Sequence, residues 1–143
     1  MIPYRHGDLF SSNTDALAHG CNIVGKMNAG IARGFKERFP EMYEDFQRRC
    51  RKGEFQLGTG YIYQNPQKPH VINLATQDGR YSGLGYIETS LEWMSRLQLP
   101  NISTIAMPKI GCGLGRQNWE VVEKIIEKYF SESRLNLEIW TPK

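Results

Sequence analysis

Hydrophobic and polar residues repeat along the chain in two different rhythms. Four segments place apolar residues at helical spacing with charged residues between them, and we expect helices at 31–39, 41–51, 88–97 and 119–130. Six short segments are apolar or alternating and are bounded by glycine, proline or polar residues, so we expect strands at 2–10, 14–22, 58–63, 71–75, 105–107 and 135–140. Because strands and helices mostly alternate, the pattern predicts one α/β domain with three layers, in which helices cover both faces of a mixed, largely parallel sheet.

Two of the loops that follow predicted strands are rich in glycine. Gly25 and Gly30 precede one predicted helix, and Gly111, Gly113 and Gly115 precede another. Glycine allows positive φ and a close approach of other groups, while N–H groups at a helix start attract anions. A plain strand-to-helix turn is the alternative. Neither of the usual nucleotide-binding motifs, Gly-x-x-x-x-Gly-Lys-Ser/Thr and Gly-x-Gly-x-x-Gly, is present. If the two glycine loops face one another, they would suit a diphosphate.

Several polar residues stand where predicted strands end. Asp8 either caps a turn or accepts a hydrogen bond from an amino group of a ligand. His19 is either a satisfied core residue or a ligand or acid–base group, since it lies three positions before Asn22 at the carboxyl end of a strand, where open α/β sheets bind ligands. A long polar loop from Thr76 to Gly83 follows another strand at the same expected edge.

Composition narrows the class of protein further. The chain has 143 residues, 40% of them hydrophobic and 23% charged, with a net charge of +3. This mild charge favours a small anionic ligand over a nucleic-acid groove. Three cysteines and three histidines are scattered without the spacing of a disulfide framework or a metal site. No signal peptide or long apolar run occurs, so we expect a cytoplasmic, monomeric protein without membrane contact.

Four short motifs, taken in order and at their spacing, resemble the macrodomain family over nearly the whole chain. They are Gly7-Asp8-Leu9, residues 15–22, residues 27–32, and residues 107–115 with Trp119. The chain is most similar to the branch that contains terminal ADP-ribose protein glycohydrolase, yeast-type ADP-ribose-1″-phosphate phosphatase and the antitoxin macrodomains that remove ADP-ribose from DNA. The resemblance implies the macrodomain fold and an ADP-ribose pocket without cofactor or metal. The expected partner is ADP-ribose or an ADP-ribosylated macromolecule, including nucleic acid only if it carries ADP-ribose.

The resemblance also implies roles for particular residues. Asp8 would accept from the adenine amino group with Leu9 beside it, Asn22 would face the distal ribose, and Pro142 would close over adenine. The residues implied to wrap the diphosphate and distal ribose are Met27, Asn28, Ala29, Gly30, Ile31, Ala32, Ile110, Gly111, Cys112, Gly113, Leu114 and Gly115.

The chain departs from the glycohydrolase pattern at two positions. That enzyme has a lysine just after the strand ending at Ala75 and an acid where this chain has Gly115; here Thr76 or Gln77 takes the place of the lysine. The amine nucleophile and the acid are therefore missing. The phosphatase type is similar in having a histidine at position 19 and a threonine near 76.

These observations lead to one main hypothesis and two alternatives. The main hypothesis is a slow hydrolase acting at the ribose C1″ end of ADP-ribose-1″-phosphate or an ADP-ribosyl ester, in which His19 transfers a proton and Thr76 orients water. The loop from Gly111 to Gly115 would hold the charge. The first alternative is a non-catalytic reader of ADP-ribosylated protein or nucleic acid. The second is a Rossmann-like binder of AMP or NAD.

Overall fold

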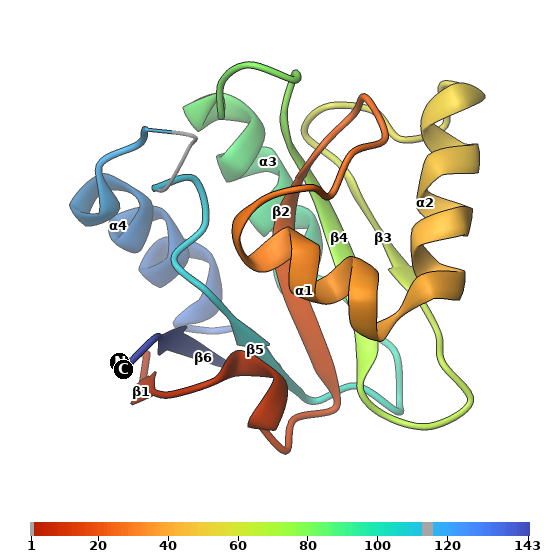
Figure 1. Ribbon diagram of the computed structural model, residues 1–143. Helices are drawn as coiled ribbons and strands as arrows, with labels where there is room; N and C mark the ends of the chain where they lie inside the picture. The colour runs from red at the N-terminus through yellow and green to blue at the C-terminus, as the bar shows by residue number, and fades with distance from the viewer. Residues whose placement is uncertain (1, 113–115) are drawn as a thin grey trace.

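The computed structural model describes residues 2–112 and 116–143, which form a six-stranded sheet with helices packed against it (Figure 1). The strands are β1 (Tyr4–His6), β2 (Ala16–Asn22), β3 (Gly60–Tyr63), β4 (His70–Gln77), β5 (Thr104–Met107) and β6 (Asn136–Thr141). The helices are α1 (Gly30–Arg38), α2 (Pro40–Arg51), α3 (Leu84–Ser95) and α4 (Trp119–Phe130), with a short 3-10 helix, η1 (Leu9–Ser11). The strand order is β1-β6-β5-β2-β4-β3, and β3 alone of these strands runs antiparallel to its neighbour.

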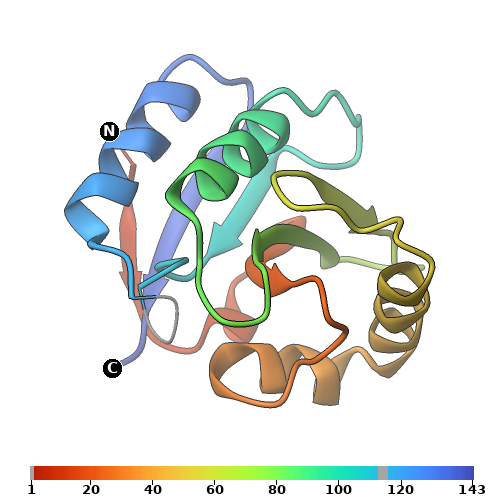
Figure 2. The same cartoon turned by 90° about the horizontal axis from the view of Figure 1, so that it is seen from above.

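The sheet is the middle of three layers, which confirms the predicted fold class. Helices α1 and α2 lie on one face and α3 and α4 on the other (Figure 2). Because side chains alternate along a strand, Ala16 and Ala18 of β2 pack into the α3/α4 core, while Leu17 and Cys21 pack into the α1/α2 core. Each helix contributes an apolar stripe to its own core, as its sequence periodicity predicts.

The helices begin at different local signals. Pro40, predicted to close the first helix, is also the first residue of α2, a position where proline loses no hydrogen bond. Asn118 caps α4 by accepting from the N–H of Glu120 (2.9 Å). Helix α1 has no side-chain cap: it follows Ala29 and begins at Gly30, whose φ of +60° suits glycine. Among the described residues no side chain caps the first N–H groups of α1, so these groups can meet a ligand.

Five parallel strands end at the same edge of the sheet. The segments that follow β1, β6, β5, β2 and β4 lie along this edge in the order of the strands. Ile31, predicted to belong to the buried stripe of α1, is 40% exposed here, while Phe35 one turn later is fully buried. The first turn of α1 therefore extends past the core and over the edge where ligands bind in open α/β sheets.

Candidate functional site

Two clefts lie along the carboxyl edge of the sheet. The first, called here the β1–β6 cleft, has a volume of about 660 Å³ and is lined by His6, Gly7, Asp8, Ser11, Trp140, Pro142 and Lys143. The second, the central cleft, has a volume of about 200 Å³ and is lined by Gly20, Ala29, Gly30, Ile31, Ala32, Gln77, Pro108, Lys109, Ile110 and Gly111. Since β6 and β5 are neighbours in the sheet, the two clefts occupy adjacent parts of one edge.

The central cleft is built mainly from backbone. The uncapped first turn of α1 opens into it through residues 29–32, so free N–H groups and the positive end of the helix dipole meet there. On the opposite wall Gly111 has a φ of +78°, and a Cβ at this position would lie 2.7 Å from Cδ1 of Ile87. Only glycine fits there without displacing its neighbours. The arrangement suits an anion held by backbone donors.

Gln117 joins the two loops that face the cleft from β4 and β5. Its backbone N–H donates to the carbonyl of Gly111 (2.7 Å), and its side-chain Nε2 donates to the carbonyl of Ser82 (2.6 Å). Ser82 in turn forms an isolated bridge with Gln77. One side chain therefore connects the loops that contribute Gln77 and Gly111 to the cleft.

Asn22 does not line the central cleft in the described part of the chain, although the resemblance implies that it faces a ribose. Its amide oxygen accepts from the N–H groups of Val24 (3.1 Å) and Lys26 (3.2 Å), and its amide nitrogen donates to the carbonyl of Lys26 (2.9 Å). The side chain thus closes the loop between β2 and α1, which is a common use of asparagine. Asn22 shapes the loop through both atoms of its amide group, and the single hydrogen bond of its amide nitrogen leaves the second N–H of that group unused among the described residues.

His19 lies in the core on the α1/α2 side of the sheet. It is fully buried, its ring stacks on Phe35 with centroids 3.7 Å apart, and Nε2 donates to Asn73 Oδ1 (2.7 Å). Burial lowers the pKa of His19 to about 4, against the smaller raising effect of the Asn73 hydrogen bond. A ring that is neutral at pH 7 and has no exposed surface cannot exchange a proton with a substrate. The structure therefore argues against the predicted acid–base role.

Thr76 projects to the opposite face of the sheet from His19. It is also fully buried, and its Oγ1 has no hydrogen-bond partner among the described residues. A Cβ at Gly20 would lie 2.7 Å from this hydroxyl, so Thr76 sits directly beneath the part of the cleft floor formed by Gly20. The hydroxyl of Thr76 is near the central cleft but lies beneath its floor. Because His19 and Thr76 point to opposite faces of the sheet, the structure does not bring the two side chains together.

Asp8 keeps accepting capacity in the β1–β6 cleft. Its Oδ1 accepts from the N–H of Phe10 (3.0 Å) and so caps η1, while Oδ2 lies 3.8 Å from Nη2 of Arg38. Both side chains of this pair are more than half exposed, so the pairing is loose. Pro142 lines the same cleft, next to Trp140. Leu9, by contrast, is buried and packs into the α1/α2 core.

The remaining predicted residues divide into three groups. Ala29, Gly30, Ile31, Ala32, Ile110 and Gly111 all line the central cleft. Met27 is a buried core residue, Asn28 accepts from Lys36 (3.4 Å) beside a separate hollow, and Cys112 donates to the carbonyl of Ile110 (3.3 Å). Gly113, Leu114 and Gly115 lie outside the described residues.

Two polar side chains of the central cleft were not among the predicted site residues. Gln77 and Lys109 are the polar side chains among its described lining residues. Nζ of Lys109 lies 5.6 Å from the ring centroid of Trp119. In the sequence, Gln77 stands two residues after the predicted strand 71–75, and Lys109 stands between the predicted strand 105–107 and the glycine loop that follows it. Neither residue type marks a site on its own.

No group of three or more histidine, cysteine, aspartate or glutamate side chains in residues 2–112 and 116–143 is placed to hold a metal ion. No helix in those residues is long and apolar enough to cross a membrane.

A family model described as "Macro domain" matches residues 18–126. This chain belongs to the macrodomain family. The match spans most of the sequence and includes residues 18–22 of β2, both glycine loops and the lining of the central cleft. It confirms the resemblance drawn from the four short motifs.

Curated relatives and solved structures agree with this membership. The chain is 36% identical to DNA ADP-ribosyl glycohydrolase of Mycobacterium tuberculosis over 92% of its own length, but it spans only 39% of that protein. It is 33% identical to human ADP-ribose glycohydrolase OARD1, covering 98% of this chain and 91% of the relative. It is 29% identical to the ADP-ribose 1″-phosphate phosphatase of Candida albicans, covering 90% and 94% of the two chains.

Two solved structures are similar over the whole macrodomain. The macrodomain of Mycobacterium tuberculosis DarG has a TM-score of 0.92 at 34% identity and covers 100% of this chain and 99% of its own. Thermosipho africanus DarTG in complex with ADP-ribose has a TM-score of 0.89 at 26% identity, with coverage of 100% and 42%.

Proposed function

We propose that this macrodomain binds ADP-ribose along the carboxyl edge of its sheet and hydrolyses ADP-ribose derivatives at the C1″ end of the distal ribose. The observation that carries the proposal is the pair of adjacent clefts, one with the open carboxylate of Asp8 and one with the uncapped start of α1. Asp8 accepts from the adenine amino group beside Pro142. The N–H groups at residues 29–32 hold the diphosphate, and the distal ribose lies over Gly20 and Gln77.

The names of the relatives support the C1″ end as the site of reaction. Relatives in bacteria, human and yeast are named for removing ADP-ribose from DNA, for ADP-ribose glycohydrolysis, or for removing the 1″-phosphate. All three names describe a bond at the distal ribose or its phosphate. For this chain, ADP-ribose-1″-phosphate and ADP-ribosylated macromolecules are the proposed substrates.

Direct attack by water is the mechanism that the lining of the central cleft favours. The cleft has no carboxylate, histidine or hydroxyl among its described lining residues, but it has the amide of Gln77 and the ammonium group of Lys109. Gln77 orients a water molecule through its amide oxygen, and Lys109 adds positive charge near the phosphates. Water delivers its oxygen to C1″ or to the 1″-phosphorus, and its proton leaves with the departing group. Without strong acid–base assistance, such a reaction is slow.

Calorimetry and a release assay test the two parts of this proposal separately. Titration with ADP-ribose should show one-site binding, and absence of binding at millimolar ligand would contradict the pocket. Incubation with ADP-ribose-1″-phosphate or an ADP-ribosylated oligonucleotide should release phosphate or free ADP-ribose. Gln77→Ala should lower turnover about 100-fold, the scale of effect expected when a reacting group is misplaced, and should lower ADP-ribose affinity far less. Gln98→Ala, beyond the end of α3, is the matched control and should behave like wild type.

A non-catalytic reader is the second candidate, and the burial of two side chains favours it. His19 is neutral in the core and the hydroxyl of Thr76 is covered, so neither assists a reaction in this conformation. Binding of a modified protein or oligonucleotide that stays intact during prolonged incubation would establish the reader. Steady release of ADP-ribose that depends on Gln77 would exclude it.

A further inference from the structure

Trp119 links the first turn of α4 to the edge strand β1. Its indole N–H donates to the hydroxyl of Tyr4 (2.9 Å), and that hydroxyl donates in turn to Glu123, one turn further along α4. Burial and the hydrogen bond to Glu123 raise the pKa of Tyr4 to about 12, so the hydroxyl keeps its proton at neutral pH and serves both partners. The rings of Tyr4 and Trp119 also meet edge to face, with centroids 6.5 Å apart. The ring of Trp119 is therefore fixed in one orientation.

The face of this fixed ring holds the ammonium group of Lys109. Nζ of Lys109 lies 5.6 Å from the ring centroid, which is within the range of a cation–π interaction. Lys109 is an exposed residue, and it takes part in no ion pair among the described residues. Glu123, the carboxylate of this cluster, accepts from Tyr4. Trp119 therefore restrains a positive charge that is available to a ligand.

The strand order sets where this charge lies along the edge of the sheet. Lys109 follows β5 and lines the central cleft, while Trp119 contacts Tyr4 of β1, the strand that leads to Asp8 in the β1–β6 cleft. In the order β1-β6-β5-β2-β4-β3, the ammonium group thus lies on the side of β5 that faces β1, and Gln77 at the end of β4 lies in the other direction. In the proposed binding mode, the diphosphate crosses this part of the edge, because it joins the adenosine to the distal ribose.

We propose that Trp119 is a positioning residue that holds the ammonium group of Lys109 toward the diphosphate of the ligand, so that the pair sets affinity and not the rate of reaction at C1″. This rests on the proposed function, because the ligand must run from one cleft to the other. A restrained ammonium group loses less conformational freedom on binding than a mobile one, so it contributes more to affinity.

A double-mutant cycle, measured by calorimetry with ADP-ribose, tests the coupling of the two side chains. Lys109→Met removes the charge and should weaken binding about tenfold, the scale of one hydrogen bond to a charged group. Trp119→Leu removes the ring and should weaken binding about twofold to fivefold, the scale of an exposed cation–π interaction. In the Lys109→Met background, Trp119→Leu should weaken binding no further. Trp119→Phe, which keeps a ring face for the ammonium group, should recover most of the affinity.

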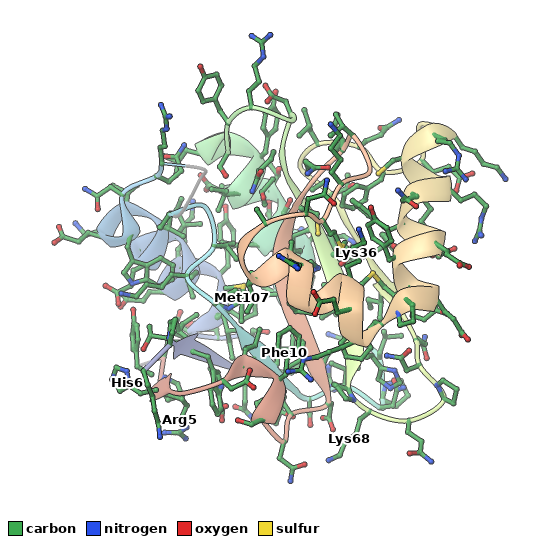
Figure 3. All side chains as sticks on the ribbon, viewed as in Figure 1. Arg5, His6, Phe10, Lys36, Lys68 and Met107 are labelled. Carbon is green, nitrogen blue, oxygen red and sulfur yellow. The ribbon has the colours of Figure 1, made fainter. Side chains whose placement is uncertain are left out.

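Turnover separates positioning from catalysis. With ADP-ribose-1″-phosphate as substrate, Trp119→Leu and Lys109→Met should raise KM far more than they lower kcat, because an interaction made equally in the ground state and the transition state acts on KM. Lys68→Met is the matched control. It removes the same charge from an exposed lysine that lies two residues before the start of β4, at the opposite edge of the sheet from the clefts (Figure 3), and it should bind and react like wild type. Thermal unfolding of each variant checks that the fold is retained.

Three results would overturn the inference while binding of ADP-ribose by wild type stands. Unchanged affinity in Lys109→Met would place the ammonium group away from the ligand. An equal loss from Trp119→Leu with and without the charge of Lys109 would make Trp119 a structural residue only. A fall in kcat without a rise in KM would place the charge at the reacting bond. If wild type binds no ADP-ribose, the proposed function itself fails.

Discussion

His19 shows how burial alone decides the chemistry of a side chain. The amide oxygen of Asn73 can only accept, so Nε2 of His19 carries the proton and Nδ1 is a bare acceptor without a partner among the described residues. The amide nitrogen of Asn73 donates a hydrogen bond to the hydroxyl of Tyr61 (3.0 Å), which extends the hydrogen-bond network. Protonating the ring would place a charge between Phe35 and this neutral network, which is unfavourable in the core.

The free energy of unfolding should therefore decrease as the pH is lowered through a defined window. His19 is lowered from a pKa of 6.5 to about 4, so below pH 6.5 the unfolded chain takes up a proton that the folded chain does not. Stability is complete above pH 6.5 and is lost progressively towards pH 4, by about 3 kcal/mol in total.

Urea unfolding between pH 7 and pH 4 measures this loss. The difference between wild type and His19→Gln isolates the histidine from carboxylates that titrate in the same range. A difference that stays constant over the window would contradict the low pKa. Retention of turnover by a folded His19→Gln protein would agree with the absence of an acid–base role.

Gly20 and Thr76 should be energetically coupled. Gly20→Ala places a methyl group 2.7 Å from Thr76 Oγ1, and overpacking of this kind costs about 1–3 kcal/mol. In a Thr76→Ala background the clashing oxygen is absent, so the same substitution should cost less. A double-mutant cycle by urea unfolding gives the coupling.

A second glycine provides the control for this cycle. A Cβ at Gly85, within α3, meets nothing within 4 Å, so Gly85→Ala should be neutral or stabilising, as expected for alanine in a helix. Strict additivity between positions 20 and 76 would mean that the floor of the cleft adjusts without strain.

At the scale of elements, periodicity predicted the helices and strands but not the directions of the polar side chains between them. Phe35, Met42 and Phe46 are fully buried, as their helical spacing predicted, because a 3.6-residue repeat encodes the buried face directly. The start of α3 at Leu84, four residues before the predicted Glu88, followed no clear cap signal in the sequence.

The candidate site was predicted only in part, because the sequence shows where glycines lie but not where polar side chains point. The backbone walls of the central cleft were found, since glycine at strand ends is visible in the sequence. The opposite orientations of His19 and Thr76 depend on the register of β2 against β4, in which His19 pairs with Asn73, and register is a tertiary property. The role that the resemblance implies for Asn22 stays a prediction, because an amide that faces a ligand and an amide that closes its own loop look alike in sequence.

Gln117 should act as a positioning residue for one half of the ligand. Gln117→Leu keeps the volume of the side chain but removes its hydrogen bond to Ser82, so the loops that carry Gln77 and Gly111 lose their connection. Affinity for ADP-ribose should fall about fivefold to tenfold, the scale of one lost hydrogen bond. Affinity for AMP, which requires only the β1–β6 cleft and the adjacent donors, should change little.

The matched control for Gln117 is Gln56→Leu. Gln56 also donates to a backbone carbonyl, that of Gly53 (3.4 Å), but it lies in the loop after α2. Calorimetry with both ligands on both variants separates the roles. Parallel loss of AMP and ADP-ribose affinity in Gln117→Leu would indicate a general disturbance of the fold.

At the scale of the whole molecule, the parallel sheet explains how distant segments serve one ligand. Asp8 and Gln77 are far apart in sequence, yet Asp8 follows β1, Gln77 is the last residue of β4, and both strands end at the same edge. Helix α1 contributes its uncapped start to that edge, and Gln117 fixes the neighbouring loops. An extended ligand with a base at one end and a ribose at the other matches two clefts in a row.

Asp8 tests whether the two clefts act together on one ligand. Asp8→Ala removes the acceptor for the adenine amino group, and a hydrogen bond to a charged group contributes about 1.5–3 kcal/mol. Affinity for AMP and for ADP-ribose should therefore fall by the same factor, while ribose 5-phosphate, which has no adenine, should bind as it does to wild type. Calorimetry with the three ligands measures this directly.

Because Asp8 also caps η1 through Phe10, Asp8→Ala should lose stability as well. Asp8→Ser is the control: serine retains the cap but is too short to reach a base, so it should lose affinity with a smaller loss of stability. If Asp8→Ser binds AMP as tightly as wild type, or if ribose 5-phosphate weakens in parallel, then adenine does not lie in the β1–β6 cleft and the ligand is held by the central cleft alone.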